Sequence, residues 1–311
     1  MTETGKGILA MVVTCVIWGI SGFYFKALAH IPPEEILAHR TVWSFVFFFG
    51  ILLAQRRIGA LRDLLRSRRV WQIALAAVMI SLNWFFFIYC VQIGRALSVS
   101  LGYYIFPLVA VLLGVILFRE RLRTGHAIAV ILAAVAVTTL TVGLGAAPWI
   151  SLLLATTFGL YGVVKKGLDV GPLMGVTAEV ALLAPLGLIW LIGVHTMGWE
   201  GLTGRNLGAF GTNWHDTLLL AFSGVWTAVP LLLFSYAARR LSYGLVGLLE
   251  YINPTLQFLV AALFLGELVT PWHMIALPII WVALAIYSWV TLSHERAESK
   301  RAARVATSGT T

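Results

Sequence analysis

The chain has 311 residues, of which 60% are hydrophobic and 11% are charged, and its mean hydropathy is +0.91. A soluble globular domain carries about 25% charged residues, so this composition excludes a soluble fold. The net charge of +9 would suit a nucleic-acid-binding protein. The arginines, however, stand in blocks between apolar runs, which is the pattern that orients helices in a membrane. We therefore expect a membrane protein without a nucleic-acid partner.

Apolar runs predict ten membrane-spanning helices, because a helix needs about 20 residues to cross the hydrocarbon core. They cover approximately residues 7–27, 35–54, 71–92, 97–118, 124–143, 148–168, 173–194, 216–238, 243–265 and 272–292. The first run reaches its Trp- and Phe-rich end without an A-x-A cleavage site, so we expect it to remain attached as the first span.

Lys and Arg alternate between the two sides of this ten-span arrangement. Eighteen of the 22 fall on one side, three (Lys26, Arg95 and Arg205) fall on the other, and Arg40 lies within a span. Because basic residues favour the cytoplasmic side, the count predicts an even number of spans with both termini cytoplasmic. We expect the external loop at 195–215 to be a flexible connection, and the polar tail at 294–311 to be disordered.

The chain repeats internally at an offset of 147 residues. Residues 70–122 align with residues 217–269 without a gap, at 11 identities in 53 positions that include Pro107 with Pro254 and Glu120 with Glu267. Five spans is an odd number, so the second half must enter the membrane in the opposite orientation. The predicted fold is therefore all-α, with two inverted five-helix repeats at 1–145 and 146–293. Glu120 and Glu267, each thirteen residues past its Pro, are expected to be structural groups at the membrane surface.

Ionisable side chains inside the predicted spans mark a candidate site, because an ionised residue at a span centre costs about 3 kcal/mol to insert. Arg40 lies about six residues into the second predicted span, and Glu179 lies at the corresponding depth of the seventh. The two charges predict a cross-repeat ion pair or shared site, or else two independently solvated groups. The neighbouring His39 is a further ionisable candidate.

Glu250 is the strongest candidate for carrying a proton. Together with Asn253 and Gln257 it follows the 3- and 4-residue spacing of one helix face in an otherwise apolar span. The alternative is a hydrogen-bonded seam between helices. Pro107 and Pro254 occupy matching positions where each removes a backbone hydrogen bond, so they predict either helix breaks that line a cavity or packed kinks.

Aromatic and amide side chains supply the rest of the predicted substrate pathway. Tyr103, Tyr104 and Tyr251 stand beside the two prolines, while Trp18, Asn83 and Trp226 lie in other spans. Such residues would give an organic solute an amphipathic aromatic lining, although each is also an ordinary core or lipid-facing residue.

Enzymatic alternatives have weaker support. The GISG string at Gly19–Gly22 matches the GxSG string of intramembrane serine proteases, for which His39 would have to be the base of Ser21. The sequence contains no GxxxxGK[ST] phosphate loop and no clustered metal ligands. We therefore expect no enzyme activity, no cofactor and no metal.

Several strings together resemble the EamA/RarD family of the drug/metabolite transporter superfamily over nearly the whole chain. They are IWGISGFYFK at 17–26, EILAHRTVWS at 35–44, NWFFFIYCV at 83–91, SLGYYIFPL at 100–108, FGLYGVVKKGL at 158–168, GVWTAVPLLLFSYAARRLS at 224–242, YINPTLQFL at 251–259 and FLGE at 264–267. One departure is Phe106, where RarD-like sequences usually have Asn, whereas Asn253 precedes Pro254 in the second repeat.

The resemblance implies a secondary transporter of the bacterial inner membrane that exports a small organic metabolite or drug by alternating access. Arg40 would attract an anionic group, Glu250 or Glu179 would take and release a proton, and the aromatic, Asn and Gln side chains would contact the solute. A flippase for lipids or amphipathic solutes is an alternative on the same fold. The sequence leaves the oligomeric state open between a monomer and a homodimer.

Overall fold

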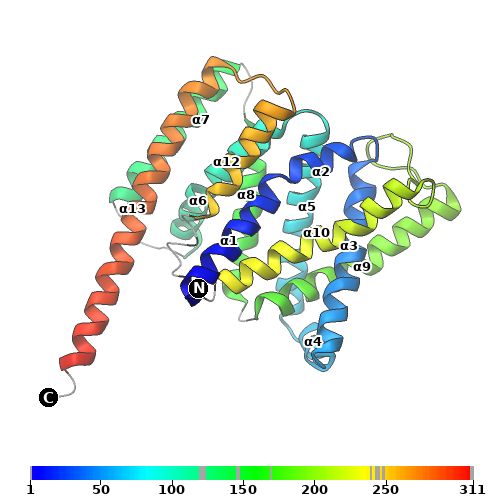
Figure 1. Ribbon diagram of the computed structural model, residues 1–311, viewed down its shortest axis with the longest axis horizontal. Coiled ribbons are helices and arrows are strands. Elements are labelled where there is room, and N and C mark those ends of the chain that lie inside the picture. The colour runs from blue at the N-terminus through cyan, green and yellow to red at the C-terminus, as the bar shows by residue number, and fades with distance from the viewer. Residues whose placement is uncertain are drawn as a thin grey trace.

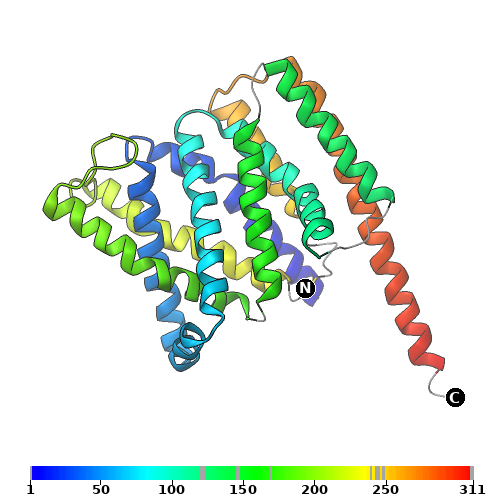
Figure 2. The same cartoon turned by 180° about the vertical axis from the view of Figure 1, so that it is seen from behind.

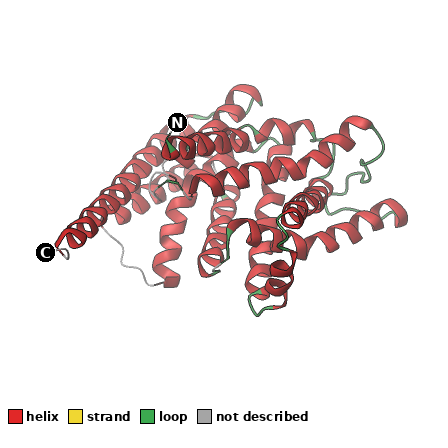
Figure 3. Cartoon of the chain, turned by 60° about the horizontal axis from the view of Figure 1, so that its bottom comes forward, coloured by secondary structure: helices red, strands yellow, loops and turns green. Residues whose placement is uncertain are grey.

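The computed structural model describes residues 2–118, 124–144, 148–168, 170–238, 240–241, 246 and 249–308, and within these ranges it contains helices and loops but no strand (Figure 3). The helices are α1 (Glu3–Gly19), α2 (Ser21–Ala27), α3 (Pro33–Ala54), α4 (Ile58–Arg66), α5 (Val70–Gln92), α6 (Ala96–Phe118), α7 (Thr124–Leu144), α8 (Trp149–Gly167), α9 (Pro172–Met197), α10 (Trp214–Ala238), α12 (Ile252–Leu259), the π-helix η1 (Val260–Phe264) and α13 (Pro271–Ser308).

Seven helical segments among these residues are long and apolar enough to cross a membrane. They belong to α1 with α2, and to α3, α5, α7, α9, α10 and α13, while three shorter apolar segments lie at Ala96–Phe106, Trp149–Lys165 and Ile252–Phe264. The described helices therefore confirm what the composition predicts, a helical protein that crosses the membrane several times.

Helices from the two halves of the chain pack crosswise. The N-terminal α1 contacts α10 and α12, whereas α8, which follows residue 148, contacts α5 and α6. Figure 1 shows α7 and α13 side by side at one edge of the molecule, and Figure 2 shows α8 against α5 and α6 from behind. The core thus lies between the halves, because each half covers the apolar face of the other.

The first apolar run forms two helices rather than one. The helix breaks at Ile20, and α2 begins at Ser21. Gly19, just before the break, allows α1 to approach α12 closely, since a Cβ added there would lie 2.5 Å from Leu256 Cβ. The break and the close approach place α1 against α12, and α2 against η1.

The two prolines differ in their effect on the helices. Helix α6 is continuous past position 107, whose side chain is outside the described part. Pro254 lies in the first turn of α12, which follows an interruption of the helix at Tyr251. The missing N–H of a proline has no partner to lose in a first turn, so Pro254 is compatible with a helix that starts again after this interruption.

Two segments outside the predicted spans are helical. The Arg-rich break after α3 contains α4, an amphipathic helix in which Leu61 is buried and the arginines point outward. Helix α13 runs on to Ser308 through the segment that we predicted to be disordered. That segment, HERAESKRAARVA, is rich in Ala, Glu, Arg and Lys, which are strong helix formers.

Candidate functional site

The buried arginine of α3 has no carboxylate partner among the described residues. Arg40 is 8% exposed, and its guanidinium lies over the ring of Trp84 at 4.0 Å and near the ring of Phe25 at 5.8 Å. Its Nε has no hydrogen-bond partner. Tyr24 and Tyr103 are the groups that interact with its charge electrostatically. The positive charge therefore sits in an aromatic surround with its donors largely unused.

Glu179 forms an ion pair, but not with Arg40. Its carboxylate on α9 is 2% exposed, accepts a hydrogen bond from Lys165 Nζ at 2.6 Å and accepts another from the Tyr161 hydroxyl at 3.2 Å. The cross-repeat pair that equal depth suggested is thus wrong. Depth along a span does not specify the lateral neighbour, and the long stem of Lys165 lets its charge reach inward from the end of α8.

His39 and Ser21 do not form a catalytic pair. The His39 ring stacks on Phe210 with their centroids 4.6 Å apart, and its Nε2 has no partner. The Ser21 hydroxyl instead donates to the backbone carbonyl of Trp18 at 2.5 Å. The GISG string therefore serves the bend between α1 and α2, which removes the arrangement that a serine protease requires.

Three of the predicted substrate contacts bind other protein groups. Tyr103 donates to Asn83 Oδ1 at 3.1 Å, and Asn83 Nδ2 donates to Leu154 O and Thr157 Oγ1, both at 3.0 Å. The Tyr104 hydroxyl shares a 2.7 Å hydrogen bond with Thr255. In this arrangement these polar groups form hydrogen bonds among α5, α6, α8 and α12.

Of the three polar residues predicted to share one helix face, only Asn253 and Gln257 are hydrogen-bonded to each other. Asn253 and Gln257 are both buried, and Gln257 Nε2 donates to Asn253 Oδ1 at 2.9 Å. Glu250 is half-buried, lies close enough to Cys15 and Tyr103 to interact with them electrostatically, and forms no hydrogen bond or ion pair within the described ranges. It is therefore a carboxylate whose charge no described cation compensates.

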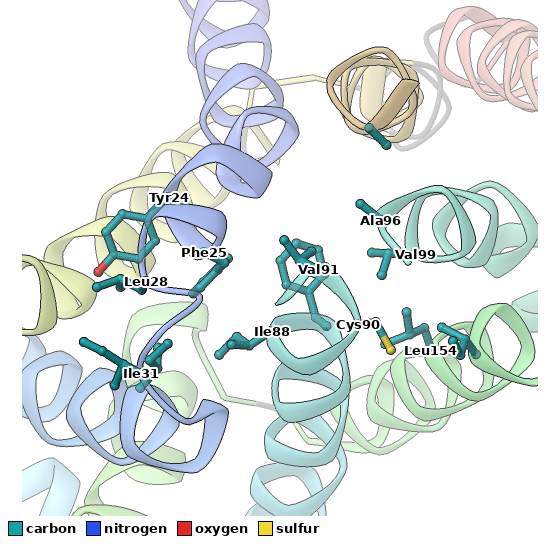
Figure 4. Packing of buried hydrophobic residues seen from close by; sticks show 14 of the residues in the cluster. Tyr24, Phe25, Leu28, Ile31, Ile88, Cys90, Val91, Ala96, Val99 and Leu154 are labelled. Carbon is teal, nitrogen blue, oxygen red and sulfur yellow. The ribbon is translucent and has the colours of Figure 1, made fainter. Parts of the chain in front are cut away.

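Aromatic side chains form the wall between α2, α5 and α10. Trp226 stacks on Tyr24 with ring centroids 5.2 Å apart, and Phe25 meets Phe87 edge to face at 5.5 Å. Figure 4 shows Tyr24 and Phe25, consecutive residues of α2, on different sides of the helix, with Phe25 directed toward the side chains of α5. Trp18 is on the adjoining α1, where its ring lies 6.0 Å from that of Phe234. Tyr251 packs against the neighbouring cluster of α6, α7 and α13.

The interior beside this wall is nearly closed. A cavity of about 10 Å³ lies among Gly19, Gly22, Phe87, Val91 and Gln257, which is room for about one water molecule. A solute of metabolite size would therefore require the surrounding helices to separate.

The segment between α9 and α10 is bound to α3, which the sequence did not predict. Glu34 Oε1 accepts hydrogen bonds from the backbone N–H and the hydroxyl of Thr203, and Glu35 accepts from the N–H groups of Gly208 and Phe210. Arg205 donates to Ala29 O at 2.8 Å and to Gln92 Oε1 at 2.6 Å. We call residues 198–213 the strap. It is held in place rather than being a flexible connection.

Glu267 lies where the repeat predicted a structural group. Its two carboxylate oxygens accept from the backbone N–H groups of Ala96 at 2.6 Å and Leu97 at 2.8 Å. A negative side chain there satisfies free N–H groups and opposes the helix dipole at the start of α6. Its repeat partner Glu120 is outside the described residues.

Comparison with known proteins identifies relatives of the whole chain. Residues 5–142 match the model of the EamA-like transporter family. The chain is 38% identical to the "Uncharacterized transporter YojE" of Bacillus subtilis, with 95% of this chain and 97% of that protein covered. It is 37% identical to "Protein RarD" of Escherichia coli, at 96% and 99% coverage, and 31% identical to the "Chloramphenicol-sensitive protein RarD" of Pseudomonas aeruginosa, at 97% and 99% coverage.

One solved structure supports the fold alone. A protein crystal structure with 18% identity superposes with a TM-score of 0.58, covering 92% of this chain and 98% of the other.

Proposed function

Because the chain belongs to the EamA-like transporter family, together with proteins named RarD, we propose that it is a secondary transporter exporting a small organic metabolite or drug across the bacterial inner membrane. The observation that carries this proposal is the match along nearly the full length of proteins named as transporters, in a chain with seven candidate membrane spans. The absence of a nucleotide-binding loop from the sequence favours an ion gradient over ATP as the energy source.

The proposed architecture is ten spans in two inverted five-helix repeats, with both termini in the cytoplasm. The crosswise contacts support it, because α1 and α8 would be the first helices of the two repeats. Helix α1 contacts α10 and α12 of the second half, and α8 contacts the equivalent helices α5 and α6 of the first half. Binding between the halves would then let each half rock against the other during alternating access.

Proton coupling is assigned to Glu250 in this proposal. A half-buried carboxylate without a described cationic partner can exchange a proton with little change in its other contacts, whereas Glu179 is held by Lys165 and Tyr161. His39, stacked on Phe210, is the next candidate.

A flippase is the second candidate function, and one observation favours it. A lateral groove of about 550 Å³ lies along α7 next to Trp272, with Ile131, Val135 and Val142 in its lining. The hydroxyls of Thr138 and Thr139 in this groove donate to carbonyls of their own helix, so they offer a lipid headgroup little. The groove is therefore suited to acyl chains more than to a complete lipid.

Transport by Glu250→Gln in proteoliposomes tests the proposal. Glutamine imitates the protonated carboxyl group, so we expect loss of uptake or efflux driven by a pH gradient across a panel of metabolites and drugs, with substrate exchange retained. Exposed Glu200→Gln is the matched control and should behave as the unmodified protein. Unchanged gradient-driven transport would remove Glu250 as the proton carrier, and loss of both exchange and binding would mark it as a substrate ligand.

A parallel lipid assay separates the two candidate functions. Proteoliposomes containing a fluorescent phospholipid are treated with dithionite, which bleaches the outer leaflet alone. Rapid bleaching of the inner-leaflet lipid, together with no movement of any water-soluble solute, would support the flippase function and contradict the solute-transporter function.

A further inference from the structure

The charge of Arg40 is buried without a counter-charge, which is an expensive arrangement inside a membrane protein. The side chain is 8% exposed, its Nε has no partner, and no carboxylate pairs with it in the described part of the chain. Desolvation of an ion is compensated only when an opposite charge and hydrogen bonds replace the lost water. An uncompensated arginine at such a position therefore indicates that its counter-ion comes from outside the chain.

The Lys165–Glu179 pair is a buried charge that the chain neutralises with a charge of its own. Glu179 is paired with Lys165 at 2.6 Å and also accepts from Tyr161. Because the Lys165 ammonium already neutralises Glu179, it cannot neutralise a ligand at the same time. Within the described core, Arg40 is left as the cation that is available to an incoming group.

The surroundings of Arg40 suit a planar acid group. The guanidinium carbon lies over the ring of Trp84, 4.0 Å from its centroid, and Nε has no hydrogen-bond partner. A guanidinium fork matches two oxygens of one acid group, which a lysine ammonium does not. The contact with an aromatic ring also restricts the guanidinium before a ligand arrives.

Aromatic side chains adjoin the charge and suit an apolar body attached to the acid. Phe25 lies 5.8 Å from the guanidinium, and Tyr24 and Tyr103 are within electrostatic range of it. Trp226 stacks on Tyr24 and carries a second buried donor, Nε1, that has no partner. A solute with an aromatic or apolar part and one further acceptor would satisfy both unused donors.

We propose that the Arg40 guanidinium binds the acid group of the transported solute, so that the substrate is an organic monoanion, a carboxylate or a sulfonate, with an apolar or aromatic body. This inference rests on the proposed transport function and deepens it by naming the substrate class. A dianion would leave one charge uncompensated beside a single available cation, and a cationic drug would be repelled by it.

Thermal stability of the purified protein tests the binding step without requiring transport. The probes are benzoate and benzenesulfonate, with benzamide and benzenesulfonamide as neutral counterparts of the same shape. We expect the two anions to raise the melting temperature and the two amides not to do so. Arg40→Gln should weaken anion binding by about ten- to hundredfold, which is the effect of losing a charge-assisted hydrogen-bonded pair.

The unliganded variant gives a second, opposite signature. Because Arg40→Gln removes an uncompensated charge, its melting temperature without ligand should rise, whereas loss of a merely structural arginine would lower it. Arg240→Gln is the matched control, since Arg240 also lies on an aromatic ring, at 3.5 Å from that of Tyr236, but is paired with Glu3 at 2.9 Å. That control should lower stability slightly and leave anion binding unchanged.

Transport of the same four probes separates failure of this inference from failure of the proposed function. Movement of benzenesulfonate, but not of its amide, would support both. Movement of neutral or cationic panel members with no anion binding would overturn the anion site and leave the transporter intact. Anion binding that depends on Arg40, with no movement of any solute, would overturn the transporter instead. Equal stabilisation by anions and amides, or no stabilisation by either anion, would refute the proposed site.

Discussion

Removing the lysine of the Lys165–Glu179 pair should destabilise the protein more than removing its glutamate. The Glu179 side chain is 3% exposed, so in Lys165→Met its charge remains trapped with only the Tyr161 hydroxyl as a donor. Breaking a buried pair in this way costs about 3–5 kcal/mol. The Lys165 side chain is 23% exposed, which places the expected cost near the lower bound, at about 3 kcal/mol.

The reverse change has a smaller cost for a physical reason. In Glu179→Gln the amide oxygen still accepts from Tyr161, and the freed lysine can extend its stem and place its ammonium at the membrane surface. We expect a loss of about 1 kcal/mol, the size of one net hydrogen bond. The double variant Lys165→Met/Glu179→Gln contains no trapped charge, so it should lie within about 1 kcal/mol of the unmodified protein, a coupling of about 3 kcal/mol between the two positions.

Unfolding in mixed micelles with increasing dodecyl sulfate measures the free energy of all four proteins. A loss of 3 kcal/mol corresponds to roughly a hundredfold change in the unfolding equilibrium, which is well above the error of such titrations. Gly175→Ala is a useful comparison, since a Cβ there would meet the Lys165 ammonium without removing any charge. Equal costs for the two single variants, or additive costs in the double variant, would refute a trapped charge as the cause.

Two further predictions concern orientation and capping. Reporter fusions should read as periplasmic at Gly204 and as cytoplasmic at Arg62, Lys166 and Thr311; a periplasmic signal from the last of these would contradict the ten-span arrangement. Glu267→Gln should lower the unfolding free energy by about 1–2 kcal/mol, because it weakens two charge-assisted bonds at the start of α6, without altering substrate preference. The repeat predicts the same phenotype for Glu120→Gln, and altered selectivity at normal expression would count against a capping role for either residue.

The positions of the membrane helices could be read from the sequence because burial in lipid imposes a simple rule on composition. Long apolar runs with charged ends mark spans whatever their neighbours are. The structural role of Glu267 could also be predicted, because its spacing from Pro254 in the repeat predicted a carboxylate at the membrane surface, near helix ends. The amphipathic spacing of Ile58, Leu61 and Leu65 could also have predicted α4 in the Arg-rich break, where we considered the charge alone.

The neighbours of the charged residues could not be predicted in the same way. Which side chain faces Glu179 depends on how α8 and α9 rotate and tilt against each other, and apolar spans of similar composition constrain neither. The strap was missed for a related reason. Glu34 Oε1 and the Glu35 carboxylate accept hydrogen bonds from backbone N–H groups of residues 203–210, and a backbone donor leaves no mark in the sequence.

The strap has a consequence for the speed of the transport cycle. Six hydrogen bonds join it to α3, to α5 and to the segment after α2, through Thr203, Arg205, Gly208 and Phe210. Four of them end on α3, and at about 0.5–1.5 kcal/mol each these four sum to roughly 2–6 kcal/mol that must be overcome together if α3 is to move away from the strap. A barrier made of bonds that rupture in one step has a large activation enthalpy. Turnover limited by that step would therefore rise steeply with temperature, while solute affinity, which is set elsewhere, would change little.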